Sequence, residues 1–178
     1  MDIVGFALLG CVTGIGGGTV RDILLGALPV FWVKQPAYLL TCVVVSCAAF
    51  FVAHLVHSRL RLLLWCDAVG LALFSVTGAE VALSLGAGSA IAIAMGVATA
   101  TFGGIIRDIL GSEIPIILRR EIYVTAALLG AAVFVVGQHY GLTKDISLIA
   151  GFVAALASRS AAVIFDLSLP VFTRSNSA

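Results

Sequence analysis

Two pairs of oppositely charged residues lie in an otherwise apolar chain. Arg21-Asp22 and Arg107-Asp108 each end a motif, GGTVRD and GGIIRD, and the motifs recur at a spacing of 86 residues, from Arg21 to Arg107. A charge near a bilayer centre costs from about 2.5 kcal/mol upward, so it needs a partner or water. Neighbouring helix positions point about 100° apart, which argues against pairing within a motif. Two alternatives remain: Arg21 pairs with Asp108 and Arg107 with Asp22, or both pairs lie at headgroup level and reach the interface.

The glycines before these charges predict a path for a solute. Glycine has no side chain and a permissive backbone, so a cluster in mid-span can bend or break a helix and expose backbone groups to a hydrated path. The alternative is close packing of helices through small residues. Because the cluster is duplicated and is followed by charges, we expect bends that line a pathway. The residues concerned are Gly14, Gly16, Gly17, Gly18, Gly103 and Gly104.

Other charged residues in apolar segments leave alternatives open. Glu80 follows a small polar patch and either lines a path or hydrogen-bonds a neighbouring helix. Arg159 either pairs with an acid or contacts a lipid phosphate. Asp67 and Asp166 lie near segment ends, which predicts interfacial positions.

No pattern indicates an enzyme. The sequence has no HExxH, GxSxG or GxxxxGK[ST] motif. The cysteines lie in apolar stretches without CxxC spacing, and the histidines have no metal-ligand spacing with them. We therefore expect no catalytic residue, no metal site and no cofactor, with thiols that pack as small hydrophobes. The four cysteines are Cys11, Cys42, Cys47 and Cys66.

The elements that must position these residues are membrane spans. The chain is 61% hydrophobic and 11% charged, with a mean hydropathy of +1.18, whereas soluble domains are about 25% charged. This predicts an all-α membrane protein, and the absence of a basic run argues against nucleic-acid binding. Six apolar segments reach the roughly 20 residues of a span, near residues 3–26, 37–57, 62–84, 88–111, 121–139 and 146–168.

The duplication predicts an inverted repeat. The motifs lie on the first and fourth segments, which cross the membrane in opposite directions, and Pro29 maps onto Pro115 at the same spacing. Such repeats occur in transporters, with the solute site at the repeat interface. The span at 62–84 lacks a counterpart before the first motif, so we expect a start upstream of Met1 or a truncated variant. The expected partition is one transmembrane domain, 1–178, with repeat 1 at 1–57, repeat 2 at 62–139 and a final helix at 146–168.

Basic residues predict the orientation. The face with more Lys and Arg is cytoplasmic under the positive-inside rule, and this places the C-terminus in the cytoplasm. One face holds Arg59, Arg61, Arg119, Arg120 and Arg174, and the other holds Lys34 and Lys144. Aromatic residues near the predicted span ends fit interfacial belts: Trp32, Tyr38, Trp65, Tyr123 and Tyr140.

The paired motifs resemble those of a bacterial inner-membrane family, the glycine transporter domain family. The resemblance rests on GGGTVRD at 16–22 with PVFWVK at 29–34, and on GGIIRD at 103–108 with EIP at 113–115 and LRREIY at 118–123. The family is similar to the trimeric intracellular cation channels, which have two inverted three-helix repeats and a seventh helix. The resemblance implies a homotrimer with one pathway in each protomer, between helices bent at the glycine clusters. It also implies that the first helix of repeat 1 is missing here. Phe102 stands opposite Gly16, where the second glycine triplet would begin, and either narrows the path or packs.

The predicted function is the passage of a small solute across the bacterial inner membrane. The family name suggests glycine, and the related channels suggest a monovalent cation such as K+ or Na+. Paired Arg and Asp groups suit a zwitterion, whereas a path lined by carbonyls suits a cation. The alternative is a non-transporting membrane scaffold or lipid-binding assembly, because small-residue packing and basic loops fit that function too.

Overall fold

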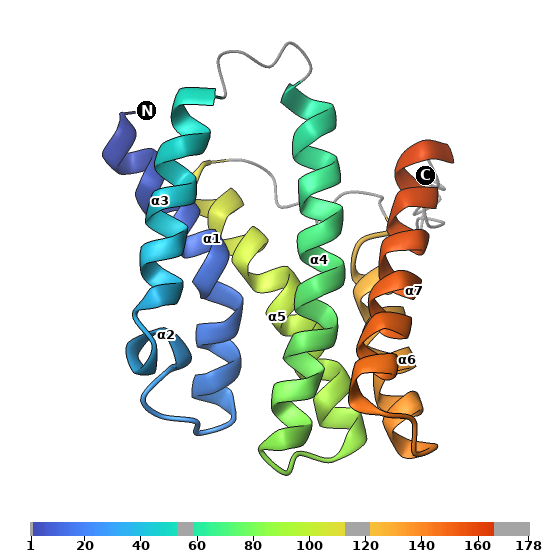
Figure 1. Ribbon diagram of the computed structural model, residues 1–178. Coiled ribbons are helices and arrows are strands. Elements are labelled where there is room, and N and C mark those ends of the chain that lie inside the picture. Colours follow the sequence, from blue (N-terminus) through green and yellow to red (C-terminus); the bar gives the residue numbers. More distant parts are fainter. Residues whose placement is uncertain (1, 53–58, 113–121, 166–178) are drawn as a thin grey trace, which may run out of the picture.

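The computed structural model describes residues 2–52, 59–112 and 122–165, which form helices and no strand (Figure 1). The predicted all-α fold class is confirmed. The helices are α1 (Ile3–Leu24), α2 (Phe31–Lys34), α3 (Ala37–Val52), α4 (Arg59–Ser84), α5 (Ser89–Leu110), α6 (Val124–His139) and α7 (Lys144–Phe165).

Each predicted span coincides with one helix. α1, α4, α5 and α7 are long and apolar enough to cross a membrane. α3 and α6 are also apolar, and 16 residues of each lie in the described part of the chain. α2 has four residues and lies between the first two spans, where no helix was expected.

Three helices end at a glycine with positive φ. Gly26, Gly86 and Gly141 follow α1, α4 and α6 with φ of +67°, +84° and +79°. In each case the next residue donates its N–H to the carbonyl five residues back, which is the Schellman arrangement. Glycine adopts this left-handed backbone without strain, so these turns reverse the chain within a few residues.

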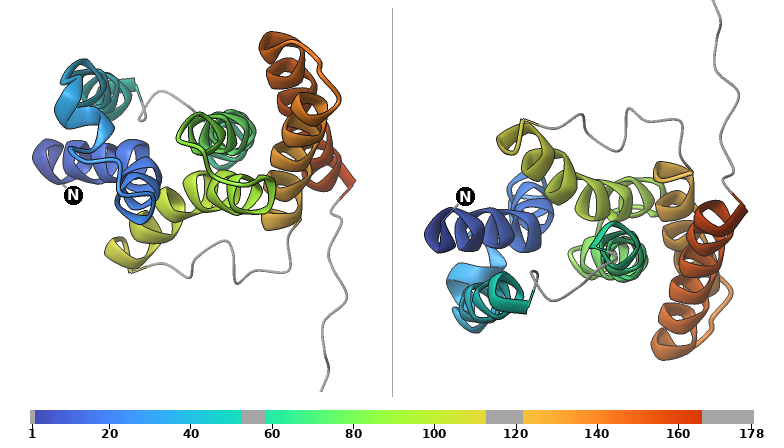
Figure 2. Two further views of the ribbon diagram at one scale, coloured as in Figure 1. Left: turned by 90° about the horizontal axis from the view of Figure 1, so that it is seen from below. Right: turned by 90° about the horizontal axis from the view of Figure 1, so that it is seen from above.

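Two groups of helices meet at a crossing. α1 contacts α3 and α5, while α4 contacts α5, α6 and α7. Along the chain, α1 descends in the view of Figure 1 and α5 rises, so the two run in opposite directions. Figure 2 shows α1 and α3 at one side, α6 and α7 at the other, and α4 with α5 between them.

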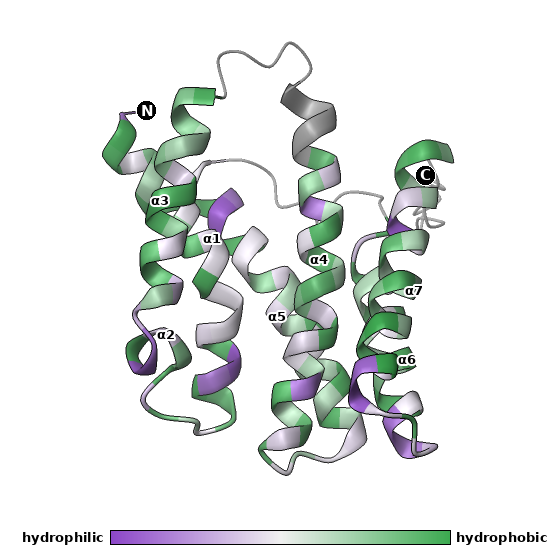
Figure 3. Ribbon diagram, viewed as in Figure 1, coloured by the Kyte–Doolittle hydropathy of each residue, from purple (hydrophilic) through white to green (hydrophobic). Residues whose placement is uncertain are grey.

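Small residues form the core of the α4–α7 group, and large apolar residues face outward. A Cβ on Gly130 would lie 2.6 Å from the Ala155 Cβ, and one on Gly151 would lie 2.7 Å from the Gly130 carbonyl oxygen. Such close backbone approach is typical of membrane helix packing. Hydrophobic residues cover the outer sides of the long helices (Figure 3), as a lipid-facing surface requires.

Candidate pathway between two crossing helices

The two glycine clusters bring α1 and α5 into backbone contact. A Cβ on Gly17 would fall on the Thr99 carbonyl oxygen, and a Cβ on Gly103 would fall on the Thr13 carbonyl oxygen. Both Thr13 to Thr99 and Gly17 to Gly103 span the 86-residue spacing of the duplicated motifs. The contact is thus reciprocal, as an in-plane two-fold relation between antiparallel helices requires.

Both helices bend while keeping their backbone hydrogen bonds. Neither is interrupted at its glycines, yet each changes direction partway along its length (Figure 1). The hydroxyl of Thr13 donates to the Leu9 carbonyl at 2.7 Å, and that of Thr99 to the Met95 carbonyl at 2.6 Å. Hydroxyls that bond back into the preceding turn bend helices. The glycine clusters predicted the bends, and the threonines at the repeat spacing are a further sequence signal that the prediction did not use.

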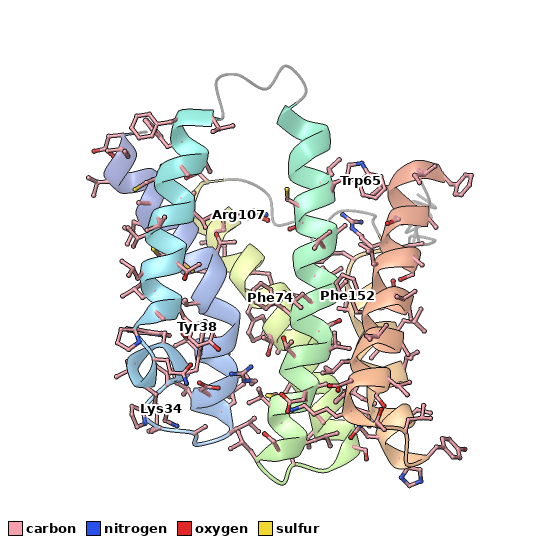
Figure 4. All side chains as sticks on the ribbon, viewed as in Figure 1. Lys34, Tyr38, Trp65, Phe74, Arg107 and Phe152 are labelled. Carbon is pink, nitrogen blue, oxygen red and sulfur yellow. The ribbon has the colours of Figure 1, made fainter. Side chains whose placement is uncertain are left out.

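A cavity of about 760 Å³ lies beside the crossing. Gly14, Gly18, Gly103 and Gly104 line it. Three other predicted residues, Gly16, Gly17 and Phe102, are not among the described lining residues of the cavity. Gly17 lies in the crossing, and a Cβ on Gly16 would lie 3.4 Å from Ile106 Cδ1. Phe102 is half-buried. The cavity wall also includes Thr13, Arg21, Phe31, Tyr38, Thr41, Cys42, Cys66, Asp67, Phe74, Thr77, Thr99, Arg107 and Tyr123, and Figure 4 labels Tyr38, Phe74 and Arg107 among them.

The prediction that adjacent charges would not pair is wrong. Nε and Nη2 of Arg21 donate to Asp22 Oδ1 at 3.0 and 2.6 Å. Nε of Arg107 donates to Asp108 Oδ1 at 2.9 Å, and its Nη2 lies 2.8 Å from the same oxygen. The arginine side chain is long enough to fold along the helix surface and reach the neighbouring carboxylate, although the two side chains leave the helix about 100° apart. Arg21 and Asp22 are 6% and 3% exposed, so the first pair is buried within the protein.

Asp67, for which the sequence predicts an interfacial position, contributes a carboxylate to the cavity wall. Its Oδ1 lies 3.8 Å from Arg107 Nη1, and its side chain is 11% exposed. α4 supplies this residue from the side of the cavity opposite α3. The sequence shows a carboxylate in an apolar helix, but nothing in it reveals that this helix face meets Arg107.

Tyr123 and Arg159 form a buried contact behind the Arg107 end of the cavity. Tyr123 is 4% exposed and Arg159 is 1% exposed, so both side chains pack inside the protein. The Arg159 guanidinium carbon lies 5.2 Å from the centre of the Tyr123 ring, a cation–π contact in a desolvated site. Arg159 therefore turns inward from α7 and does not face lipid.

Glu80 lies outside the cavity wall that the structure describes. Its Oε1 accepts from Lys144 Nζ at 2.6 Å, and the Lys144 side chain is 59% exposed. Of the two alternatives for Glu80, the structure shows the bond to a neighbouring helix. The pair ties the end of α4 to the start of α7.

Antiparallel apolar helices around a cavity lined by Arg21 and Arg107 are typical of a polytopic α-helical membrane channel or transporter. The chain belongs to the glycine transporter family, whose sequence profile matches residues 1–54 and 64–139. The expected resemblance is therefore confirmed, as is the expectation that the chain is not an enzyme.

Relatives and solved structures agree with this assignment. The chain is 43% identical over 176 residues to a UPF0126 membrane protein of Vibrio cholerae, covering 97% of this chain and 72% of the relative. It is also 43% identical over 177 residues to the UPF0126 inner membrane protein YadS of Escherichia coli K12, covering 97% and 84%.

The fold is similar to that of TRIC channels. The structure of the TRIC trimeric intracellular cation channel orthologue from Rhodobacter sphaeroides matches with a TM-score of 0.91 and 63% identity, over 94% of this chain and 86% of the other. A second TRIC cation channel structure matches with a TM-score of 0.90 and 33% identity, over 99% and 87%.

Proposed function

We propose that the chain conducts a monovalent cation such as K+ through the cavity beside the α1–α5 crossing. The observation that carries this proposal is the charge around the cavity. Two arginines, Arg21 and Arg107, face three aspartates, namely Asp22, Asp67 and Asp108. Each of these two arginines is held against its adjacent aspartate, which offsets its charge, while Asp67 is a carboxylate in the cavity wall itself.

A carboxylate in the wall of a low-dielectric cavity, here Asp67, attracts cations and repels anions. One unit charge about 10 Å from another contributes roughly 1.7 kcal/mol at an effective dielectric constant of about 20. The walls also offer the hydroxyls of Thr41 and Thr77 beside the crossing. Neutral oxygens of this kind replace part of the hydration shell of an alkali cation.

Glycine is the second candidate, favoured by one feature of the same cavity. Asp67 and Arg107 both face it, 3.8 Å apart at their nearest charged atoms. An ammonium and a carboxylate at the two ends of a small zwitterion would match these two groups. The family description, glycine transporter, agrees with this alternative.

Proteoliposome flux separates the two cargoes. Purified protein is reconstituted, and K+ efflux, chloride efflux and uptake of labelled glycine are measured against empty liposomes. We expect K+ flux above the empty control without matching chloride flux. Glycine uptake without K+ flux would replace the cation with the zwitterion, and no flux from folded protein would favour a scaffold or lipid-binding assembly.

Asp67→Asn tests the electrostatic argument, with Asp145→Asn as its control. Asp145 is an exposed acid in the first turn of α7, outside the cavity wall. The loss of roughly 1.7 kcal/mol corresponds to a decrease in K+ flux of roughly tenfold or more. We expect that decrease for Asp67→Asn and an unchanged flux for Asp145→Asn. Equal flux in both variants contradicts the role of Asp67.

The proposed setting is a homotrimer in the bacterial inner membrane, with one path per protomer and a cytoplasmic C-terminus. The name of the Rhodobacter sphaeroides structure describes a trimer, and the Escherichia coli relative is named an inner membrane protein. The excess of Lys and Arg on one predicted face supports the orientation. Arg119, Arg120 and Arg174 lie outside the described residues. Protease protection of a C-terminal tag in spheroplasts tests the orientation.

A further inference from the structure

The short helix α2 places an aromatic ring in the cavity at its Arg21 end. Phe31, the first residue of α2, lines the cavity together with Tyr38 from the start of α3. Their rings contact edge to face, with centroids 5.1 Å apart. This pair lies where the cavity meets the turn between α1 and α3.

Glycine at position 18 makes room for the Phe31 ring. A Cβ on Gly18 would lie 2.7 Å from Phe31 Cε1, closer than any side chain tolerates. The ring therefore rests directly on the α1 backbone, beside the glycine that lines the cavity. The Arg21 guanidinium carbon lies 5.9 Å from the same ring, within cation–π distance.

Asp22 holds this ring in place through the second oxygen of its carboxylate. Oδ1 accepts from Arg21, while Oδ2 accepts the backbone N–H of Phe31 at 2.7 Å. One residue further on, Trp32 Nε1 donates to Thr19 Oγ1 at 3.0 Å. Thus α2 is fixed to α1 by two hydrogen bonds from consecutive residues.

The two ends of the cavity differ in how firmly their aromatic residue is held. At the other end, a Cβ on Gly104 would lie 3.3 Å from the Tyr123 hydroxyl, so Tyr123 occupies the place that Phe31 has beside Gly18. Tyr123 is buried against Arg159. In contrast, α2 has four residues, none of them buried. An element with so few buried contacts opens at lower free energy than a packed one.

We propose that Phe31 is the residue that restricts passage at the Arg21 end of the cavity, and that Asp22 is the positioning residue that holds it there. This inference rests on the proposed function, because it assigns the restriction to one end of the proposed path. The path opens at that end when α2 moves off Gly18 and carries the ring out of the cavity. The Asp22 carboxylate then keeps Arg21 neutralised while it releases the Phe31 N–H.

Ion flux gives the first test. Phe31→Ala removes the ring, and we expect K+ flux in proteoliposomes to rise by about threefold or more. Val33→Ala is the matched control, because Val33 is on the same short helix, is 48% exposed and is outside the described cavity wall. Phe31→Leu retains apolar volume and should give an intermediate rise. A Phe31→Ala flux equal to that of Val33→Ala overturns the assignment.

Thiol labelling gives a second test that does not depend on flux. Cys42 on α3 and Cys66 on α4 both line the cavity; Cys42 lies one turn after Tyr38, whereas Cys66 adjoins Asp67 near Arg107. In single-cysteine backgrounds, Phe31→Ala should speed the reaction of Cys42 with the cationic reagent MTSET and leave Cys66 unchanged. Size-exclusion chromatography of each variant excludes misfolding as the cause of a change in the labelling rate.

The two tests separate the inference from the proposed function. Faster labelling of Cys42 with no K+ flux in any variant leaves Phe31 as the restriction and rejects the cation cargo. K+ flux in every variant with no change at Phe31→Ala, and unchanged labelling of Cys42, rejects Phe31 and leaves cation conduction standing. Asp22→Asn, which weakens the hold on α2, should act in the same direction as Phe31→Ala in the labelling assay.

Discussion

A methyl group at position 17 would meet the carbonyl oxygen of Thr99 in the α1–α5 crossing. Because that oxygen belongs to helical backbone, no rotamer change relieves the overlap. A carbon needs about 3.3 Å or more from a carbonyl oxygen, so the two helices must separate by roughly 1 Å. Gly17→Ala therefore strains the contact on which the bent pair depends.

The free energy of unfolding should fall by about 2 kcal/mol in Gly17→Ala. Overpacking costs up to about 3 kcal/mol, and the higher helix propensity of alanine returns about 1 kcal/mol. For a chain of this size, 1 kcal/mol corresponds to about 2–4 °C in Tm, so we expect Tm to fall by roughly 4–8 °C. Gly70→Ala is the matched control: this helical glycine on α4 has nothing within 4 Å of a built Cβ, and its Tm should rise slightly.

The reciprocal contact makes the double variant informative. Gly103→Ala should destabilise like Gly17→Ala, because its Cβ meets the Thr13 carbonyl oxygen at the same crossing. A single separation of the helices relieves both overlaps. The free energy of unfolding of Gly17→Ala/Gly103→Ala should therefore fall by less than the sum of the two single-variant decreases, with a difference on the order of 1 kcal/mol. Fluorescence-detected thermal unfolding in detergent measures all four variants. A Tm of Gly17→Ala equal to that of Gly70→Ala, or strict additivity in the double variant, refutes the reasoning.

Three further predictions concern buried pairs and packing. Asp22→Ala removes the partner of buried Arg21 and should lower the free energy of unfolding by about 3–5 kcal/mol, whereas Lys144→Ala, at an exposed pair, should change Tm far less. Tyr123→Leu removes the ring beside Arg159 and should lower the free energy of unfolding by about 2 kcal/mol. Tyr123→Phe keeps the ring and should lower it less. Gly130→Ala places a Cβ 2.6 Å from Ala155 Cβ and should cost about 1–3 kcal/mol; in each case an unchanged Tm contradicts the stated contact.

The spans and the crossing could be predicted from the sequence because both depend on regular patterns. Hydropathy alone located six of the seven helices in the described residues, since an apolar stretch of this length in lipid has to satisfy its backbone within a helix. The duplicated glycines indicated where α1 and α5 meet, because only residues without a Cβ allow that approach. The alternatives of bending and close packing turned out to be compatible: Gly17 packs at the crossing, while Gly14 and Gly18 line the cavity.

Side-chain partners could not be predicted, because they depend on rotamers and on how each helix is rotated about its axis. Arg21 reaches its neighbour through a flexible side chain, which the angle between Cα–Cβ directions does not reveal. Asp67 and Arg159 face inward only because α4 and α7 present those sides to α5 and Tyr123. Phe31 follows a proline-containing turn, and no periodic pattern indicates that it folds back onto Gly18.

The central claim, that the cavity beside the crossing is the solute path, is tested most directly at position 104. Gly104 lines the cavity, and a Cβ there lies no nearer than 3.3 Å to any neighbour. In a background with all four native cysteines replaced by serine, Gly104→Cys should react with MTSET, and the reaction should suppress K+ flux. Leu128→Cys, at a 48% exposed position on α6 outside the described cavity wall, is the control, and its reaction with MTSET should not change K+ flux. A thiol at 104 that stays unreactive in folded protein while K+ flux continues would contradict the account.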